Sequence, residues 1–264
     1  MSTGPEMQDI TMTPPRVPPI LPWSGEAADR YTADQMVKYW QSFDVITFII
    51  DLGVYHASLG DFLDHNEKVR VEEFRSAYFK KRFTVSRWLI RQILASLSGT
   101  ENVSDIVLVR RKEGGIEVKD HKEVHMSLSY SGSCMALSLG KRKLGCDIEV
   151  LRPTGIKKTL SCPLFGDVNC ANDSRNFLHR WTLLEAYAKL HDKNPYSLLN
   201  SGVLFQDVHF VSYCLDRYAI LSLALDSDRQ KDILIRLDPE TCKAFRPLTS
   251  LPQQNQEGTT HVRA

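Results

Sequence analysis

The alternation of apolar and polar residues along the chain predicts a series of short strands. Residues 45–50 form an unbroken β-branched and aromatic run between two aspartates, which is typical of a strand buried on both faces. Further strand-like runs occur at 105–109, 116–118, 126–131, 134–139, 144–149, 205–214, 218–225 and 232–237. Short polar turns join the last three runs, which we therefore expect to form a meander in the second half of the chain.

Apolar residues that recur every three or four positions predict two long helices. The first runs from Glu72 to Leu97 and stops at Ser98-Gly99. The second covers 177–190, with Ser174 as a candidate N-cap and Asn194-Pro195 marking its end. Residues 27–41 have weaker helical character.

The element order of strand, helix and strands, repeated once, predicts an α+β fold with two lobes of similar plan. Because the first 25 or so residues are rich in proline, they indicate an extended arm. We expect an arm and linker over 1–42, an N-terminal α+β lobe over 43–143, a C-terminal α+β lobe with acidic residues over 144–240, and a polar tail over 241–264.

Composition places the chain among ordinary soluble globular proteins. Its 264 residues are 42% hydrophobic and carry a formal net charge of +1, which argues against a broad nucleic-acid-binding surface. No stretch has the length of a membrane span, and no signal peptide is visible. The six cysteines form no Cys-x-x-Cys pair, so we expect reduced thiols and a cytoplasmic protein.

Two carboxylates lie on one face of the strand predicted at 144–149. Side chains alternate along a strand, so Asp147 and Glu149 share a side opposite Cys146 and Ile148. Such a pair repels unless a cation or a shared proton neutralises it, and hard oxygen ligands suit Mg²⁺ or Mn²⁺. An Asp-x-Glu triplet alone is nevertheless more typical of a solvated edge strand.

On the second predicted helix, Trp181, Glu185 and Lys189 are spaced four residues apart and share one side. By itself this spacing favours a surface Glu–Lys pair beside a tryptophan that fills the core. The order of the two acidic patterns along the chain is more informative than either pattern alone.

Gly-x-Asp-x-Glu followed by Trp-Thr-x-x-Glu-Ala-x-x-Lys resembles the signature of the 4′-phosphopantetheinyl transferases of the surfactin-synthetase (Sfp) type. Residues 127–132, Ser-Leu-Ser-Tyr-Ser-Gly, correspond to that family's Asn-x-Ser-His-Ser-like stretch, and residues 82–94 resemble its first-half helix with a leading arginine. The four motifs follow the family's order. The resemblance implies a pseudo-dimer of two lobes in one chain, hence a monomer, with the active site in the cleft between them.

The resemblance further implies a holo-[acyl-carrier-protein] synthase activity. The phosphopantetheine arm of coenzyme A would pass to a serine of an apo acyl or peptidyl carrier protein, with release of adenosine 3′,5′-bisphosphate. Asp147, Glu149 and Glu185 are the expected ligands of Mg²⁺, or of Mn²⁺. Glu185 or a metal-bound water is the candidate base, and Lys189 is placed to meet the phosphates or to protonate the leaving group.

The same resemblance assigns the contacts with coenzyme A. Arg82 matches the family arginine at the nucleotide end, and Ser129 and Tyr130 would line the diphosphate together with Asp147 and Lys189. Lys68 and Arg70 fall near the family's basic residues for the 3′-phosphate. These seven residues are expectations carried over from the motifs.

Two departures from the family pattern leave alternatives open. Leu184 stands where the family has a lysine, and Tyr130 replaces the usual histidine. The missing cation could be supplied by Lys193 or Arg180. Alternatively, the protein is a catalytically impaired relative that binds coenzyme A or a carrier protein without transfer, in which case Leu184→Lys would restore activity. A metal-dependent diphosphate hydrolase would need only the carboxylates.

Overall fold

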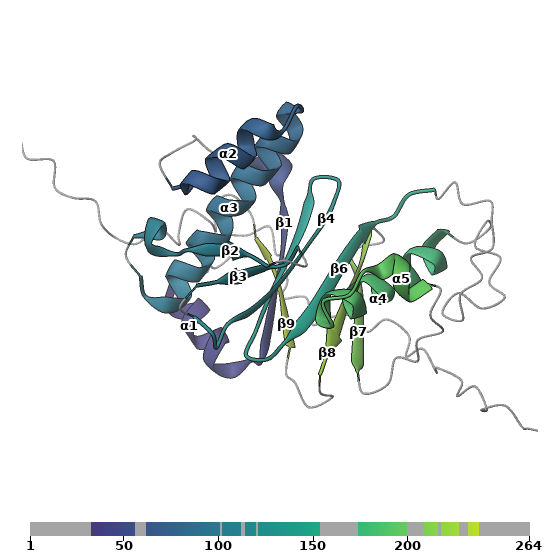
Figure 1. The fold of residues 1–264 in the computed structure, drawn as a ribbon. Coiled ribbons are helices and arrows are strands. Elements are labelled where there is room, and N and C mark those ends of the chain that lie inside the picture. Colours follow the sequence, from purple (N-terminus) through teal and green to yellow (C-terminus); the bar gives the residue numbers. More distant parts are fainter. Residues whose placement is uncertain are drawn as a thin grey trace, which may run out of the picture.

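The structure, a computed structural model, describes residues 33–55, 62–100, 102–111, 114–119, 121–153, 174–199, 208–215, 218–226 and 232–237. The helices are α1 (Ala33–Ser42), α2 (His65–Glu73), α3 (Ala77–Ser98), α4 (Ser174–Leu190) and α5 (Pro195–Leu199), with 3-10 turns η1 (Leu52–Val54) and η2 (Val103–Asp105). The strands are β1 (Val45–Asp51), β2 (Leu108–Arg110), β3 (Ile116–Val118), β4 (His125–Ser131), β5 (Cys134–Gly140), β6 (Leu144–Val150), β7 (His209–Leu215), β8 (Ala219–Leu225) and β9 (Asp232–Leu237). These elements form a mixed α+β fold (Figure 1).

The strands form two main sheets and a small hairpin. The first sheet has the order β4-β5-β1-β9, the second has the order β6-β8-β7, and β2 pairs with β3. β9 pairs with β1 in parallel, so the chain returns to the first sheet after β8. The predicted meander is therefore wrong in its third strand, because an apolar run indicates a strand but does not say which neighbour it pairs with.

β1 is the centre of the fold and is buried on both faces. Ile46, Phe48 and Ile50 pack toward α3, whereas Val45 and Ile49 pack against the second sheet. The prediction from the unbroken apolar run is confirmed, because a strand between two layers has no solvent-facing side that would require polar residues.

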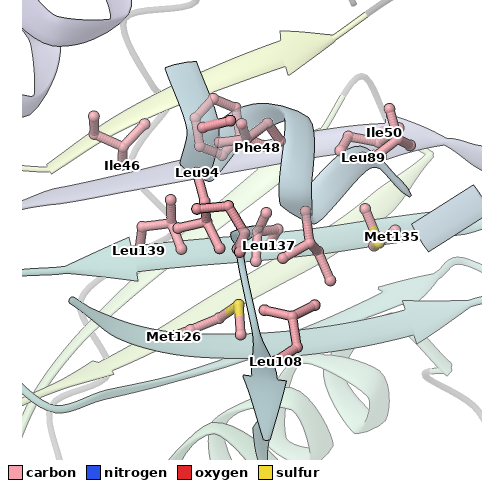
Figure 2. Packing of buried hydrophobic residues seen from close by; sticks show 14 of the residues in the cluster. Ile46, Phe48, Ile50, Leu89, Leu94, Leu108, Met126, Met135, Leu137 and Leu139 are labelled. Atoms are coloured by element: carbon pink, nitrogen blue, oxygen red, sulfur yellow. The ribbon is translucent and has the colours of Figure 1, made fainter. Parts of the chain in front are cut away.

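Four layers follow from this arrangement, in the order α3, first sheet, second sheet and α4 (Figure 1). Figure 2 shows Leu89 and Leu94 of α3 inserted over Phe48, Leu137 and the neighbouring strands. Burying a side chain of this size contributes about 1.5–3 kcal/mol. The first sheet is therefore a rigid platform beneath the residues of the candidate site.

The helix predicted from Glu72 to Leu97 is present as α3, but it begins five residues later, and its first two predicted residues belong to a separate helix, α2. α2 ends at Glu73, the chain turns over 74–76, and α3 begins at Ala77. The reason is Glu67, which belongs to the capping box of α2 and also accepts two hydrogen bonds from the buried Arg91, at 3.2 and 2.7 Å. This pair holds α2 against α3, which a single continuous helix would prevent.

Serine side chains join the edges of the two sheets, at β4 and β6. The Oγ atoms of Ser127 and Ser131 accept hydrogen bonds from the backbone N–H groups of Cys146 and Val150, each at 2.9 Å. Backbone donors of β6 that would be orphaned at a sheet edge are thereby satisfied. The alternate serines of β4 thus place β6 beside β4.

α4 packs directly on the backbone of β6 at Gly145. A methyl group added to Gly145 would lie 1.9 Å from the carbonyl oxygen of Ala186 and 2.7 Å from the amide nitrogen of Leu190. Only glycine allows this approach, which explains the first residue of the Gly-x-Asp-x-Glu motif.

Polar contacts hold the middle of α4 on the second sheet. The hydroxyl of Thr182 lies 2.7 Å from the hydroxyl of Ser222, which in turn lies 3.0 Å from that of Ser212. The buried His179 ring lies 2.9 Å from Ser212. Buried polar groups that satisfy one another fix a single packing register, so the rotation and height of α4 over the sheet are set.

Three further predictions concern the ends of the chain, membrane-spanning helices and the cysteines. The N-terminal arm and the C-terminal tail lie outside the described residues. Within the described ranges no helix is both long and apolar enough to cross a membrane. The described Cys146 and Cys214 are free thiols, as expected.

We predict that Gly145→Ala lowers the free energy of unfolding by about 3 kcal/mol or more, because the helix backbone cannot yield as a flexible side chain would. Urea unfolding followed by circular dichroism measures the loss. Gly99→Ala is the control, since its added methyl group would meet no atom within 4 Å. This variant should lose only the free energy needed to hold alanine in the left-handed conformation, about 1–2 kcal/mol. Equal losses in the two variants would contradict the close approach.

Candidate active site

β6 and α4 bring four of the predicted residues to one place. Asp147 and Glu149 project from β6 on the side predicted by strand alternation, and Glu185 and Lys189 lie one turn apart on α4. The ammonium of Lys189 lies 2.7 Å from Asp147 Oδ1 and 3.7 Å from Glu185 Oε2. The two motifs therefore meet through Lys189.

Asp147 is the buried centre of this cluster, with 2% of its surface exposed. Its Oδ1 accepts hydrogen bonds from the Ser129 hydroxyl at 2.5 Å and from Lys189 at 2.7 Å. Its Oδ2 is buried and has no hydrogen-bond partner among the described residues. Burial raises the pKa of Asp147, while Lys189 and Ser129 oppose the shift. A buried oxygen without a partner is a place for a proton or a cation.

Glu185 and Lys189 are the titratable groups on the helix side. Burial, and then the nearby Asp147 carboxylate, raise the pKa of Glu185 to about 7. Burial opposes the charge of Lys189, but Asp147 and Glu185 outweigh it and raise the pKa of this ammonium above its ordinary value. Near neutral pH the cluster therefore combines a fixed positive charge with a carboxyl group that can take up or release a proton.

Glu149 lies at the outer edge of the cluster and is already engaged. Its Oε2 accepts hydrogen bonds from Ser131 and from the guanidinium of Arg152, both at 2.6 Å. Arg152 is not among the residues that the motifs predict for the site. It follows β6 by two residues, beyond the motif, so only its spacing of three from Glu149 could have indicated the contact.

These carboxylates can be tested for their fit to a divalent cation. Asp147 and Glu185 fit, because they offer hard oxygen ligands, a buried oxygen without a partner and a negative charge that raises the pKa of Glu185. The Oε2 atom of Glu149 can join them only after Arg152 leaves, because the guanidinium of Arg152 already donates to it. Accordingly, the described part of the chain contains no group of three acidic, histidine or cysteine side chains already arranged around a metal.

The residues expected to contact coenzyme A lie on two sides of β4. Ser129 faces Asp147, whereas Tyr130 points toward α3, where the Arg82 guanidinium lies 4.9 Å from its ring centre. Burial raises the pKa of the Tyr130 phenol. Arg82 also lies over the rings of Tyr78 and Phe79, at 5.7 and 4.8 Å. The structure thus joins Ser129 to the carboxylates and joins Tyr130 to Arg82.

Leu184 does not face the carboxylates. It is 1% exposed and packs in an apolar cluster with Tyr187 of α4 and Ile220 of β8. Of the alternative cations, Arg180 is near Asn176, one turn back on α4, at 3.4 Å. Among the described residues, the cations paired with these carboxylates are Lys189 and Arg152.

Comparison with known proteins agrees with the motifs. No family model matches the chain. Over 141 residues the chain is 24% identical to the 4′-phosphopantetheinyl transferase psf-1 of Bacillus pumilus, a match that covers 51% of this chain and 60% of that relative. The chain thus spans less than two thirds of this curated relative. The predicted resemblance to phosphopantetheinyl transferases is confirmed by this similarity.

The raised pKa of Glu185 predicts a pH dependence of stability. Because its folded-state pKa of about 7 exceeds the ordinary 4.5, the folded protein binds more protons in that interval, and the free energy of unfolding falls as pH rises through it. We predict that Glu185→Gln removes this fall, so that its free energy of unfolding comes to exceed that of wild type by up to about 3 kcal/mol as the pH rises from 4.5 to 8. Urea unfolding in the presence of EDTA, repeated across this pH range, measures the difference. Parallel pH profiles would contradict the assignment, and the exposed Glu72→Gln is the control.

The burial of Leu184 predicts that a lysine there does not restore a lost function. Leu184→Lys places an ammonium in an apolar cluster and lowers the free energy of unfolding by on the order of 4 kcal/mol. Leu184→Met, which conserves volume, is the matched control and costs less than about 1.5 kcal/mol. A Leu184→Lys protein that is as stable as wild type and transfers phosphopantetheine faster would show that this side chain reaches the phosphates after all.

Proposed function

We propose that this protein transfers the 4′-phosphopantetheine arm of coenzyme A to a serine of an apo acyl or peptidyl carrier protein, in a reaction dependent on Mg²⁺ or Mn²⁺ that releases adenosine 3′,5′-bisphosphate. The proposal includes a monomeric, cytoplasmic enzyme of the holo-[acyl-carrier-protein] synthase type. The similarity to a curated phosphopantetheinyl transferase supports the general activity. The named metal, product and carrier belong to the proposal.

The main structural support for this function is the meeting of the two acidic motifs around Lys189. Lys189 joins Asp147 of β6 to Glu185 of α4 within 2.7 and 3.7 Å, although the two motifs lie far apart in the sequence. Surface acids on an edge strand and a surface Glu–Lys pair on a helix would have no reason to meet around a buried carboxylate.

The reaction requires a base and a positive charge. The serine oxygen of the carrier attacks the phosphorus that bears the pantetheine arm, and the bond from that phosphorus to the bridging oxygen breaks, so that adenosine 3′,5′-bisphosphate leaves with the electron pair. Glu185 is the candidate acceptor of the serine proton, because its carboxylate lies in the cluster beside the ammonium of Lys189. Lys189 contributes positive charge at the phosphates.

Asp147, Glu185 and, after release of Arg152, Glu149 would hold the divalent cation. The cation would neutralise the diphosphate and the charge that develops on the leaving group. Ser129 orients Asp147 through a hydrogen bond of 2.5 Å. Gly145 keeps α4 close enough for Lys189 to reach β6.

The two faces of β4 suggest how coenzyme A is divided over the site. The diphosphate would lie beside Ser129, Asp147 and Lys189, and the nucleotide end would lie toward Arg82 and Tyr130. We further propose that residues 43–143 and 144–240 are the lobes of a pseudo-dimer with the site in the cleft between them, with β9 crossing back to the first lobe.

Intact-mass spectrometry of a panel of apo carrier proteins, incubated with this protein, coenzyme A and Mg²⁺, tests the function. We predict the mass gain of one phosphopantetheine arm on a serine. Glu185→Ala should slow it by at least about 100-fold, because it removes both the base and a cation ligand. Glu72→Ala, which removes an exposed carboxylate on α2, should leave the rate unchanged.

Two other results would count against this assignment. Coenzyme A binding without a mass gain on any carrier would indicate a relative that does not catalyse transfer. Release of adenosine 3′,5′-bisphosphate without a modified carrier would indicate a diphosphate hydrolase.

A further inference from the structure

Two cations among the described residues pair with the three carboxylates of the site. Lys189 is held between Asp147 and Glu185, and Arg152 is held on Glu149. The two cations differ in their surroundings. Lys189 also donates to the backbone carbonyl of Cys146 at 3.0 Å, whereas Arg152 reaches outward from the end of β6.

The Arg152–Glu149 pair is anchored on one side and open on the other. The Glu149 side chain is 15% exposed, and the Arg152 side chain is 53% exposed. One guanidinium nitrogen, Nη1, donates to Glu149 Oε2 at 2.6 Å, to Ser131 Oγ at 3.3 Å and to the Val150 carbonyl at 3.3 Å. An ion pair with an exposed partner is weak, so Arg152 can leave at small cost.

Glu149 does not depend on Arg152 for its position. The Ser131 hydroxyl donates to the same Oε2 at 2.6 Å, and Ser131 is itself held by the Val150 amide at 2.9 Å. After Arg152 leaves, the carboxylate therefore stays where it is. A divalent cation that takes Glu149 Oε2 as a ligand must displace the guanidinium, because both need the same oxygen.

The released guanidinium suits a phosphate group. Arginine presents several N–H donors in a planar fork that matches phosphate oxygens, and it keeps its charge at any physiological pH. A diphosphate bound with a divalent cation at Asp147 and Glu185 would bring such oxygens to the outer edge of the cluster, where Arg152 lies.

We propose that Arg152 is an exchangeable cation of the site, which pairs with Glu149 in the free protein and moves to a phosphate of coenzyme A when a divalent cation takes Glu149. Arg152 then has two opposite effects on binding. It weakens the binding of the divalent cation in the absence of coenzyme A, and it strengthens the binding of coenzyme A when the cation is present. This inference rests on the proposed function only for the identity of the diphosphate.

Binding measurements on the full chain separate these effects without any carrier protein. Mn²⁺ alone, titrated by electron paramagnetic resonance, should bind Arg152→Ala up to about fivefold more tightly than wild type, because an exposed ion pair no longer competes. Coenzyme A at saturating Mg²⁺, titrated by calorimetry, should bind the same variant at least about tenfold more weakly, because a charged hydrogen bond is lost.

Two further variants guard against trivial outcomes. Arg142→Ala removes an exposed arginine from the β5–β6 turn and should change neither affinity. Arg152→Gln keeps much of the side-chain length without the charge, and it should show the same opposite shifts if Arg152→Ala does not fold. If either shift is absent or reversed in a folded variant, Arg152 is a fixed clamp on Glu149 and the inference is wrong.

The outcome is distinguishable from failure of the proposed function. Both opposite shifts without transfer to any carrier protein would retain the exchange and reject the transferase. Transfer to a carrier protein without the two shifts would retain the transferase and reject the exchange of Arg152.

Discussion

The close approach of α4 to β6 is the constraint on which the site depends. Gly145 lets the helix backbone rest on the strand, and only at that distance can Lys189 on the helix reach Asp147 on the strand, at 2.7 Å. The serines of β4 fix β6 from its other side. Asp147 is therefore buried between two elements. Burial of Glu185 itself, and then the nearby Asp147 carboxylate, raise the pKa of Glu185 to about 7. Packing thus sets the electrostatics of the cluster.

The parts of the site that sequence could predict are those that follow from local geometry. Strand alternation places Asp147 and Glu149 on one side, and helical spacing places Glu185 and Lys189 one turn apart. The double-sided burial of β1 follows in the same way from its unbroken apolar run. Each of these inferences needs only residues within one element, and the order of the motifs along the chain supplied the pairing of strand with helix.

The sequence could not predict the contacts between elements. The parallel pairing of β9 with β1 depends on the path of the chain after β8. The break between α2 and α3 depends on Glu67 reaching Arg91, 24 residues away. The pairing of Arg152 with Glu149, and the burial of Leu184 away from the carboxylates, depend on the way in which β4, β6 and α4 meet. Periodicity within a segment carries no signal for any of them.

A crystal structure with coenzyme A and Mn²⁺, phased on the anomalous signal of the metal, would show whether the metal and the diphosphate bind at these carboxylates. We expect an anomalous peak between Asp147 and Glu185, at coordination distance from the buried Oδ2 of Asp147, with the diphosphate beside it and the Arg152 guanidinium away from Glu149. A diphosphate bound elsewhere, with no metal at these carboxylates and the Lys189–Asp147 pair unchanged, would contradict this expectation.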